Sequence, residues 1–92
     1  MNNQDQVEFT AIIQEEGKFT FIAIPFFPRE KWGQRSRYKV TGTINSIPVQ
    51  GTLGALKNDY FLRLSKIWLG VSGINPGDQV SVTLSVEKNK LE

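Results

Sequence analysis

Five cations and a tryptophan lie within eleven consecutive residues, between positions 29 and 39. They are Arg29, Lys31, Trp32, Arg35, Arg37 and Lys39, and Glu30 is the one acidic residue among them. Lysine and arginine can neutralise phosphate groups, and an aromatic ring can stack on an unpaired base. This composition makes the six residues a candidate nucleic-acid-binding site.

The same segment also has a purely structural interpretation. Short helices at the end of a β-barrel commonly place their aromatic side chains on the core, while long cationic side chains stay in water. In that case Phe26, Phe27 and Trp32 form a lid. We favour the lid over the binding surface, and the sequence leaves both interpretations open.

Catalytic chemistry finds little support, because the sequence contains neither histidine nor cysteine. The usual general base at neutral pH, the commonest zinc ligands and any thiol nucleophile are therefore missing. The remaining acid–base groups of interest are Glu15, Glu16, Tyr38, Asp59, Tyr60 and Asp78. The carboxylates among them fall in expected turns, where acidic side chains usually cap backbone amides. We expect no catalytic residues, no metal and no cofactor.

Length and charge describe one small domain. The chain has 92 residues and a formal net charge of +2, which by itself indicates neither nucleic acid nor an anionic membrane as partner. No apolar run approaches the roughly 20 residues that cross a bilayer, and the first residues lack the features of a signal peptide. These features predict a cytoplasmic protein with a disordered tail at 1–6, one domain at 7–88 and a tag remnant at 91–92.

Alternation of apolar and polar residues predicts the strands. It is clearest at 79–87, where Val80, Val82, Leu84 and Val86 share one face. We expect six strands, at 7–14, 18–24, 38–44, 47–55, 60–64 and 79–87. Two short helical segments are expected at 28–33 and 65–73, because Pro28 and Ser65 are suitable helix starts and Gly33 and Gly73 suitable ends.

An offset of forty residues aligns the sequence with itself. The identities are Phe21 with Phe61, Gly33 with Gly73, Val40 with Val80, and Thr43 with Thr83. The halves 7–46 and 47–86 each show the order strand, strand, helix, strand. Two such ββαβ units, each unable to bury its apolar face alone, favour a six-stranded closed β-barrel. The predicted fold class is therefore all-β.

Four segments carry a resemblance to a known family: FTAIIQEEGKFTFIAIP, WGQRSRYKVTGTINSIPVQGTLG, YFLRLSK and GINPGDQVSVTL. Over residues 9–86 the chain resembles a small bacterial family of domains of unknown function, the one numbered nineteen-oh-five. The resemblance implies a double-split β-barrel similar to that of the AbrB and MazE regulators, and relatives that stand alone or are fused to an OmpD-associated, bacteriocin-protection type of domain. It implies no activity. Leu69 stands where the family pattern leads us to expect arginine.

The functional expectation is a non-enzymatic binding or accessory barrel whose partner is an unknown protein or small ligand. A groove between a helix and the barrel rim could accept an apolar ligand or a partner's segment, although Ile67 and Trp68 are expected to pack in the core. A nucleic-acid-binding module using residues 29–39 is the alternative, and a small acid–base enzyme the third. No membrane is expected, and monomer and homodimer are both open.

Overall fold

The computed structural model describes residues 6–34, 36–56 and 59–87. These residues form eight strands and two short helices, and every strand pairing is antiparallel. The elements are β1 (Gln6–Ile12), β2 (Gln14–Glu16), β3 (Phe19–Ile24), α1 (Pro28–Trp32), β4 (Lys39–Ile44), β5 (Ile47–Thr52), β6 (Gly54–Leu56), β7 (Asp59–Leu64), α2 (Lys66–Ser72) and β8 (Gln79–Val86).

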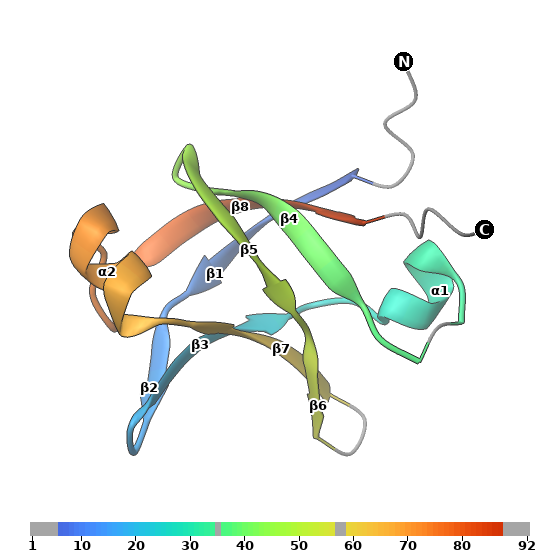
Figure 1. Ribbon diagram of the computed structural model, residues 1–92, viewed down its shortest axis with the longest axis horizontal. Helices are drawn as coiled ribbons and strands as arrows, with labels where there is room; N and C mark the ends of the chain where they lie inside the picture. Colours follow the sequence, from blue (N-terminus) through green and yellow to red (C-terminus); the bar gives the residue numbers. More distant parts are fainter. Residues whose placement is uncertain (1–5, 35, 57–58, 88–92) are drawn as a thin grey trace.

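The strands form two four-stranded sheets. One sheet has the order β1-β8-β4-β5 and the other the order β2-β3-β7-β6. The helices lie at opposite sides of the molecule, α1 after β3 and α2 after β7 (Figure 1). Neither helix is long and apolar enough to cross a membrane, since the longer one, α2, has seven residues.

The prediction of a closed six-stranded barrel is wrong. Two of the six expected strands are each divided between the sheets: the segment 7–14 becomes β1 and β2, and the segment 47–55 becomes β5 and β6. The divisions occur at Ile13 and Leu53, which are both buried. The alternation of apolar and polar residues indicates which residues face inward. It continues unchanged through a bend in the strand, so this pattern cannot reveal where the bend lies.

Strand pairings in the first half have counterparts forty residues later. The pairs Gln14–Phe21 and Gly54–Phe61 correspond in this way, as do Val7–Leu84 and Ile47–Ile44. Across the middle of the two sheets, Ile22 pairs with Leu62 and Thr43 pairs with Thr83.

The core lies between the two sheets. It is built from the inward residues of the alternating strands, among them Ile22, Val40, Leu62 and Leu84, whose exposed fractions are at most 1%. β4 and β8 approach so closely that a Cβ atom added to Gly42 would overlap the backbone oxygen of Thr83. Glycine at this position permits the approach, as expected for a glycine inside a strand that packs against another backbone.

Both helices begin and end as their sequences predict. Pro28 is the first residue of α1, and Gly33 follows its last turn with φ 85°. Ser65 caps α2 by accepting a hydrogen bond from the backbone N–H of Trp68, and Gly73 ends it in the left-handed region. Asn45 and Ser46, the two residues between the expected strands 38–44 and 47–55, form a turn with φ of 52° and 70°. Positive φ at both turn residues matches the twist of the strands β4 and β5 that they join.

Of the predicted tails, residues 1–5 and 91–92 lie outside the described residues, and Gln6 is the first residue of β1. Asp59, which was expected in a turn, is instead the first residue of β7, and the two residues before it lie outside the described residues. Glu15 and Glu16, also expected in a turn, belong to the exposed strand β2. The chain instead turns at Gly17, which has φ 61°.

Candidate functional site

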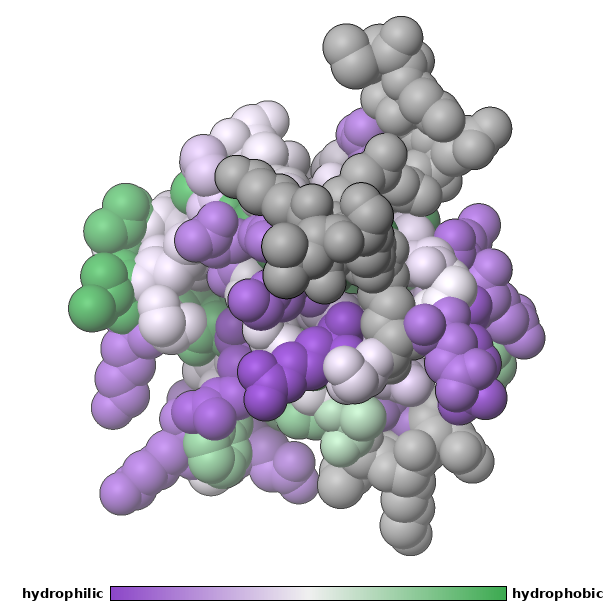
Figure 2. Space-filling view, turned by 45° about the vertical axis from the view of Figure 1, so that its right-hand side comes forward, coloured by the Kyte–Doolittle hydropathy of each residue, from purple (hydrophilic) through white to green (hydrophobic). Residues whose placement is uncertain are grey.

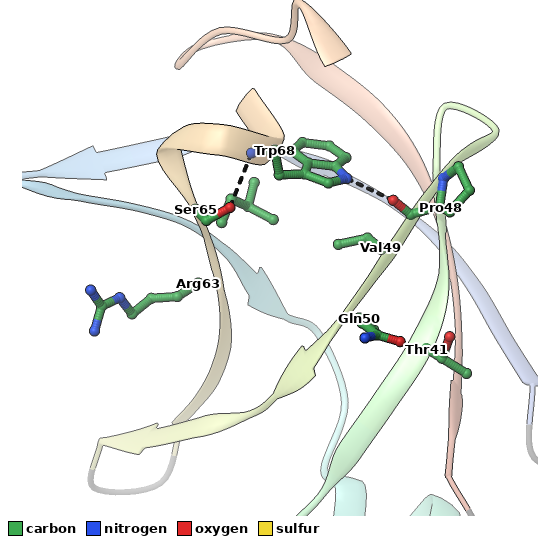
Figure 3. Close-up of a pocket in the computed structure, with 8 residues that line it drawn as sticks. Thr41, Pro48, Val49, Gln50, Arg63, Ser65 and Trp68 are labelled. Carbon is green, nitrogen blue, oxygen red and sulfur yellow. Dashed lines mark hydrogen bonds between the residues drawn. The ribbon is translucent and has the colours of Figure 1, made fainter. Parts of the chain in front are cut away.

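A groove separates β5 from the end of β7 and the start of α2 (Figure 3). Its volume is about 380 Å³. The lining residues are Thr41, Pro48, Val49, Gln50, Arg63, Leu64, Ser65 and Trp68. Trp68, Val49 and Leu64 give the groove an apolar part, while the hydroxyl groups of Thr41 and Ser65 and the amide group of Gln50 lie around it. This mixture is typical of sites that bury an apolar group and orient it by a few polar contacts.

Trp68 fixes the width of the groove at one end. Its indole N–H donates a hydrogen bond of 2.7 Å to the backbone oxygen of Pro48, across from α2 to β5 (Figure 3). The helix places the indole there because Ser65 caps the backbone N–H of the same residue at 3.0 Å. The side chain is therefore held at both its backbone and its ring, and its position does not depend on a ligand.

The strand β5 presents an unpaired backbone edge to the groove. β5 is the last strand of its sheet and pairs only with β4. The backbone oxygen of Lys39 in β4 accepts from Glu87 N–H, so the backbone N–H and C=O of Lys39 point away from β5. Successive residues of a strand direct these groups to opposite sides, so those of Thr41, two residues later, also point away from β5. Gln50 stands opposite Thr41. Its backbone N–H and C=O therefore point away from β4, on the same side as the Pro48 oxygen that Trp68 contacts.

The opposite side of the groove is the end of β7. The first three residues of β7, from Asp59 to Phe61, pair with β6. Arg63 and Leu64 come later in β7 and have no partner in β6. Leu64 is buried and Arg63 is exposed. The Arg63 side chain points away from Trp68 (Figure 3), and its guanidinium carbon lies 4.2 Å from the centre of the Phe19 ring.

The equivalent position in the first half is occupied by aromatic side chains. There, Phe9 corresponds to Val49 and Phe26 to Lys66 by the offset of forty. The Phe9 and Phe26 rings pack edge to face with their centres 5.9 Å apart. Val49 and Lys66 cannot make such a pair. The surroundings of the two positions differ as well, since Phe26 precedes α1 whereas Lys66 is the first residue of α2.

A family model described as "Domain of unknown function (DUF1905)" matches residues 9–84. The chain belongs to this family. No curated protein matches the sequence. In this DUF1905 domain Leu69, which stands where the resemblance led us to expect arginine, packs against the core from α2.

The cationic segment of the DUF1905 domain surrounds α1. Arg29, Lys31, Arg37 and Lys39 are exposed, and Arg35 lies outside the described residues. Trp32 has an exposed fraction of 7% and belongs to the core cluster. Its ring packs at 90° on Phe26 with the ring centres 5.3 Å apart, and at 6.4 Å from the Tyr38 ring. The cations are accessible, but the proposed stacking residue is buried in the folded domain.

The lid interpretation therefore describes Trp32 and Phe26, but it is wrong for Phe27, which is 53% exposed. At the other helix, Trp68 is partly buried as a lid residue should be. The expectation that Ile67 packs in the core is also wrong, since 81% of it is exposed. In Figure 2 the strongest hydrophobic colour lies at the left edge, the side on which Figure 1 places α2.

In the described part of the DUF1905 domain no group of three or more metal-ligating residues is found. Among the acid–base candidates, the rings of Tyr38 and Tyr60 lie with their centres 5.9 Å apart, and Glu16, Asp59 and Tyr60 line one hollow. The carboxylate of Asp78 accepts a hydrogen bond of 3.0 Å from Asn75 N–H, which closes the turn before β8. Tyr38 donates to the backbone oxygen of Gly33 at 2.7 Å. Both residues thus have structural partners.

A second hollow, of about 590 Å³, lies on the outer face of the sheet β2-β3-β7-β6. The rings of Phe21 and Phe61 pack edge to face there with centres 5.7 Å apart, and Phe19 is 50% exposed beside them. Asp59, Glu16 and Arg63 line its rim. This face is more apolar than the groove, and the Arg63 guanidinium lies over the Phe19 ring within it.

One sequence signal could have indicated the groove. Pro48 lies inside an expected strand, and proline occurs in sheets mainly on edge strands because it cannot donate a ladder hydrogen bond. It therefore marks β5 as an edge. The hydrogen bond from Trp68 to Pro48 could not be predicted in this way, because no sequence pattern identifies the acceptor of an indole N–H.

Proposed function

We propose that this DUF1905 domain is a non-enzymatic binding or accessory domain whose site is the groove between α2 and β5. The observation that carries the proposal is the preformed opening itself: Trp68 is hydrogen-bonded to Pro48 across one end of it, and Val49 and Leu64 supply apolar contact. Preformed sites bind with a smaller entropic penalty, because little has to be ordered when the ligand arrives. The occupant is an apolar ligand or a segment of a partner protein.

The non-enzymatic part of the proposal rests on composition. Without histidine or cysteine, the groove would have to use Ser65, Thr41 or Arg63 for chemistry. A serine nucleophile needs an adjacent base. The Ser65 hydroxyl already accepts from Trp68 N–H, and none of the described residues that line the groove carries a carboxylate. Ligand binding is what this set of side chains can do without further groups.

An amide NMR titration of the labelled domain with a fragment library tests the proposal. We expect saturable shifts at Val49, Gln50 and the Trp68 indole N–H. The matched control fills the groove from an exposed residue that lines it, with the substitution Gln50→Trp. This variant should fold and lose the fragment shifts, whereas Val71→Gln, at an 80% exposed position of α2, should keep them.

The same titration with short duplex DNA and single-stranded RNA addresses the nucleic-acid alternative. Its support is the exposure of Arg29, Lys31, Arg37 and Lys39. Salt-sensitive shifts centred on these residues, with no fragment shifts in the groove, would favour that alternative over ours. Fragment shifts that persist in the filled variant would also count against the groove as the site.

A further inference from the structure

We propose that a second copy of this chain packs on the outer face of the sheet β2-β3-β7-β6, with the two β7 strands antiparallel and Asp59 of each copy beside Arg63 of the other. The inference concerns the hollow of about 590 Å³ on this face and not the groove, so it does not rest on the proposed function. It goes beyond that function by assigning a partner to a separate surface.

The outer face of this sheet is open and apolar at its centre. The rings of Phe19, Phe21 and Phe61 line it, and Phe19 is 50% exposed. The helices α1 and α2 lie at opposite sides of the molecule and leave this face uncovered (Figure 1). An exposed cluster of apolar side chains on a folded domain marks an interaction surface.

The shape of the face suits a second sheet. A Cβ atom added to Gly54 in β6 would overlap the ring of Phe61, so this ring lies down across the neighbouring strand. On its other side Phe61 stands opposite Ala23 of β3, an exposed residue with a small side chain. The centre of the face is therefore low, as in the inner faces of two sheets that pack with their strands nearly aligned.

The charges along β7 identify the partner. Asp59, Phe61 and Arg63 are every second residue of the strand and all line the hollow, so a carboxylate, a ring and a guanidinium follow one another on the same face. A second β7 laid antiparallel over the first about Phe61 places each carboxylate against a guanidinium. A parallel arrangement would place like charges together. A copy of the chain supplies this complementary order through a two-fold axis, and each ion pair then occurs twice.

Both charged side chains are accessible to a partner. Asp59 and Arg63 are exposed, and the Arg63 guanidinium lies with its carbon 4.2 Å from the centre of the Phe19 ring. A guanidinium that stacks on a ring keeps N–H groups along its edge for a carboxylate. The contact with Phe19 therefore holds Arg63 on this face and can persist in the dimer. The other described carboxylate that lines the hollow, Glu16, is on β2, two strands away from β7.

The size of the face sets the expected affinity. β3 and β7 have six residues each, and β2 and β6 have three each. Such a face is small compared with a standard interface, so we expect a dissociation constant on the order of 100 µM. Sedimentation velocity of the 92-residue protein, loaded at concentrations from about 10 µM to about 1 mM, should show a monomer that converts to a dimer.

Charge reversal tests the antiparallel alignment. Asp59→Arg leaves two cations on the β7 face and Arg63→Asp leaves two carboxylates, so each variant should weaken its own self-association about tenfold or more. An equal mixture of the two variants should form a heterodimer, because every cation then meets a carboxylate. The double variant that carries both substitutions should dimerise again. Glu8→Arg is the control, an equal change of charge at an exposed position of β1 in the other sheet, and should leave the dimer unchanged.

Cross-linking tests the same face with its charges intact. The chain has no cysteine, so a single introduced thiol reports its own position. Ala23 pairs with Phe61 and therefore lies close to the proposed two-fold axis, where each residue meets its own copy. A short bifunctional maleimide should link two copies of Ala23→Cys at concentrations at which the dimer forms. It should leave Glu8→Cys, on the other sheet, as a monomer.

Every outcome decides. A protein that stays monomeric at the highest concentration overturns the inference, and so does a dimer that keeps its affinity in both single charge variants. Single variants that dissociate but whose mixture stays monomeric overturn the antiparallel alignment. If a charge variant does not fold, as judged by far-ultraviolet circular dichroism, the cross-linking decides, and linkage of Glu8→Cys without Ala23→Cys counts against this face. The fragment titration of the groove is independent, so either proposal can fail without the other.

Discussion

Ile13 and Leu53 stand forty residues apart and make equivalent backbone hydrogen bonds. Ile13 N–H donates to the oxygen of Asp78, just before β8, and Leu53 N–H donates to the oxygen of Tyr38, just before β4; both distances are 2.9 Å. Each residue sits at the bend where one continuous segment passes from one sheet to the other. Without these bonds, each bend would leave a buried backbone N–H without an acceptor. Because both N–H groups are satisfied, two chain segments can pass from one sheet to the other.

The close approach of β4 and β8 predicts a large effect for Gly42→Ala. The added methyl group would overlap the backbone oxygen of Thr83, and neither backbone can move without disturbing the middle of its sheet. We expect a loss of about 3 kcal/mol or more in the free energy of unfolding, measured by urea denaturation. Gly70→Ala is the control, since its Cβ meets no atom within 4 Å; it should stabilise α2 by about 0.5–1 kcal/mol. Equal stability of the two variants would contradict the close approach of the two strands.

Trp68→Phe should keep most of the apolar contact and lose the hydrogen bond to Pro48. We expect the free energy of unfolding to fall by about 0.5–1.5 kcal/mol. Ile67→Gln, one residue earlier at an 81% exposed position, should change it by less than about 0.5 kcal/mol. Both values can be taken from urea unfolding followed by circular dichroism. An unaffected Trp68→Phe would mean that the indole N–H does not hold α2 against β5.

Ser65→Ala removes the only side-chain cap that α2 has among its described contacts. N-cap replacement by alanine typically costs about 0.5–2 kcal/mol, and α2 has only seven residues over which to distribute the loss. We expect the backbone amides of 66–69 to lose protection from hydrogen exchange before the strands do. Ser65→Asp should restore protection, because aspartate is also a good cap; failure to restore it would assign the effect to something other than capping.

Tyr38→Phe tests the link between α1 and β4. The Tyr38 hydroxyl donates to the backbone oxygen of Gly33 at 2.7 Å, at the end of α1. Its removal leaves that oxygen without this donor, and we expect a loss of about 1–2 kcal/mol in a thermal or urea unfolding experiment. The ring contacts with Trp32 and Tyr60 should persist, so near-ultraviolet circular dichroism should change little. A large spectral change would show that the hydroxyl also positions the aromatic cluster.

Much of the fold could be predicted because strands and helices leave local patterns. The inward faces of the strands, the turn at Asn45 and Ser46, and the ends of both helices follow from residues whose preferences act over a few positions. The bends at Ile13 and Leu53 could not, since neither residue is unusual in a strand and the anchoring partners, Asp78 and Tyr38, are distant in sequence. Tertiary hydrogen bonds, and not local preference, decide where those segments divide.

The site was harder to predict than the fold. The cationic segment attracted attention because charge is visible in the sequence, yet Trp32 at its centre is buried. The groove depends instead on the reach of one indole from α2 to β5, a contact between residues twenty positions apart in the sequence. Ile67 looked like a core residue because it is apolar, but α2 presents it to solvent.

The position of β8 limits when this domain can fold during synthesis. β8 is the last of the described strands to be made, and it lies inside its sheet between β1 and β4, with which it pairs on both sides. A ribosome-bound chain that has released only residues up to α2 holds β1 without any partner in that sheet. We therefore expect a nascent chain truncated before Gln79 to remain protease-sensitive, and the domain to gain resistance in one step once Val86 has left the exit tunnel.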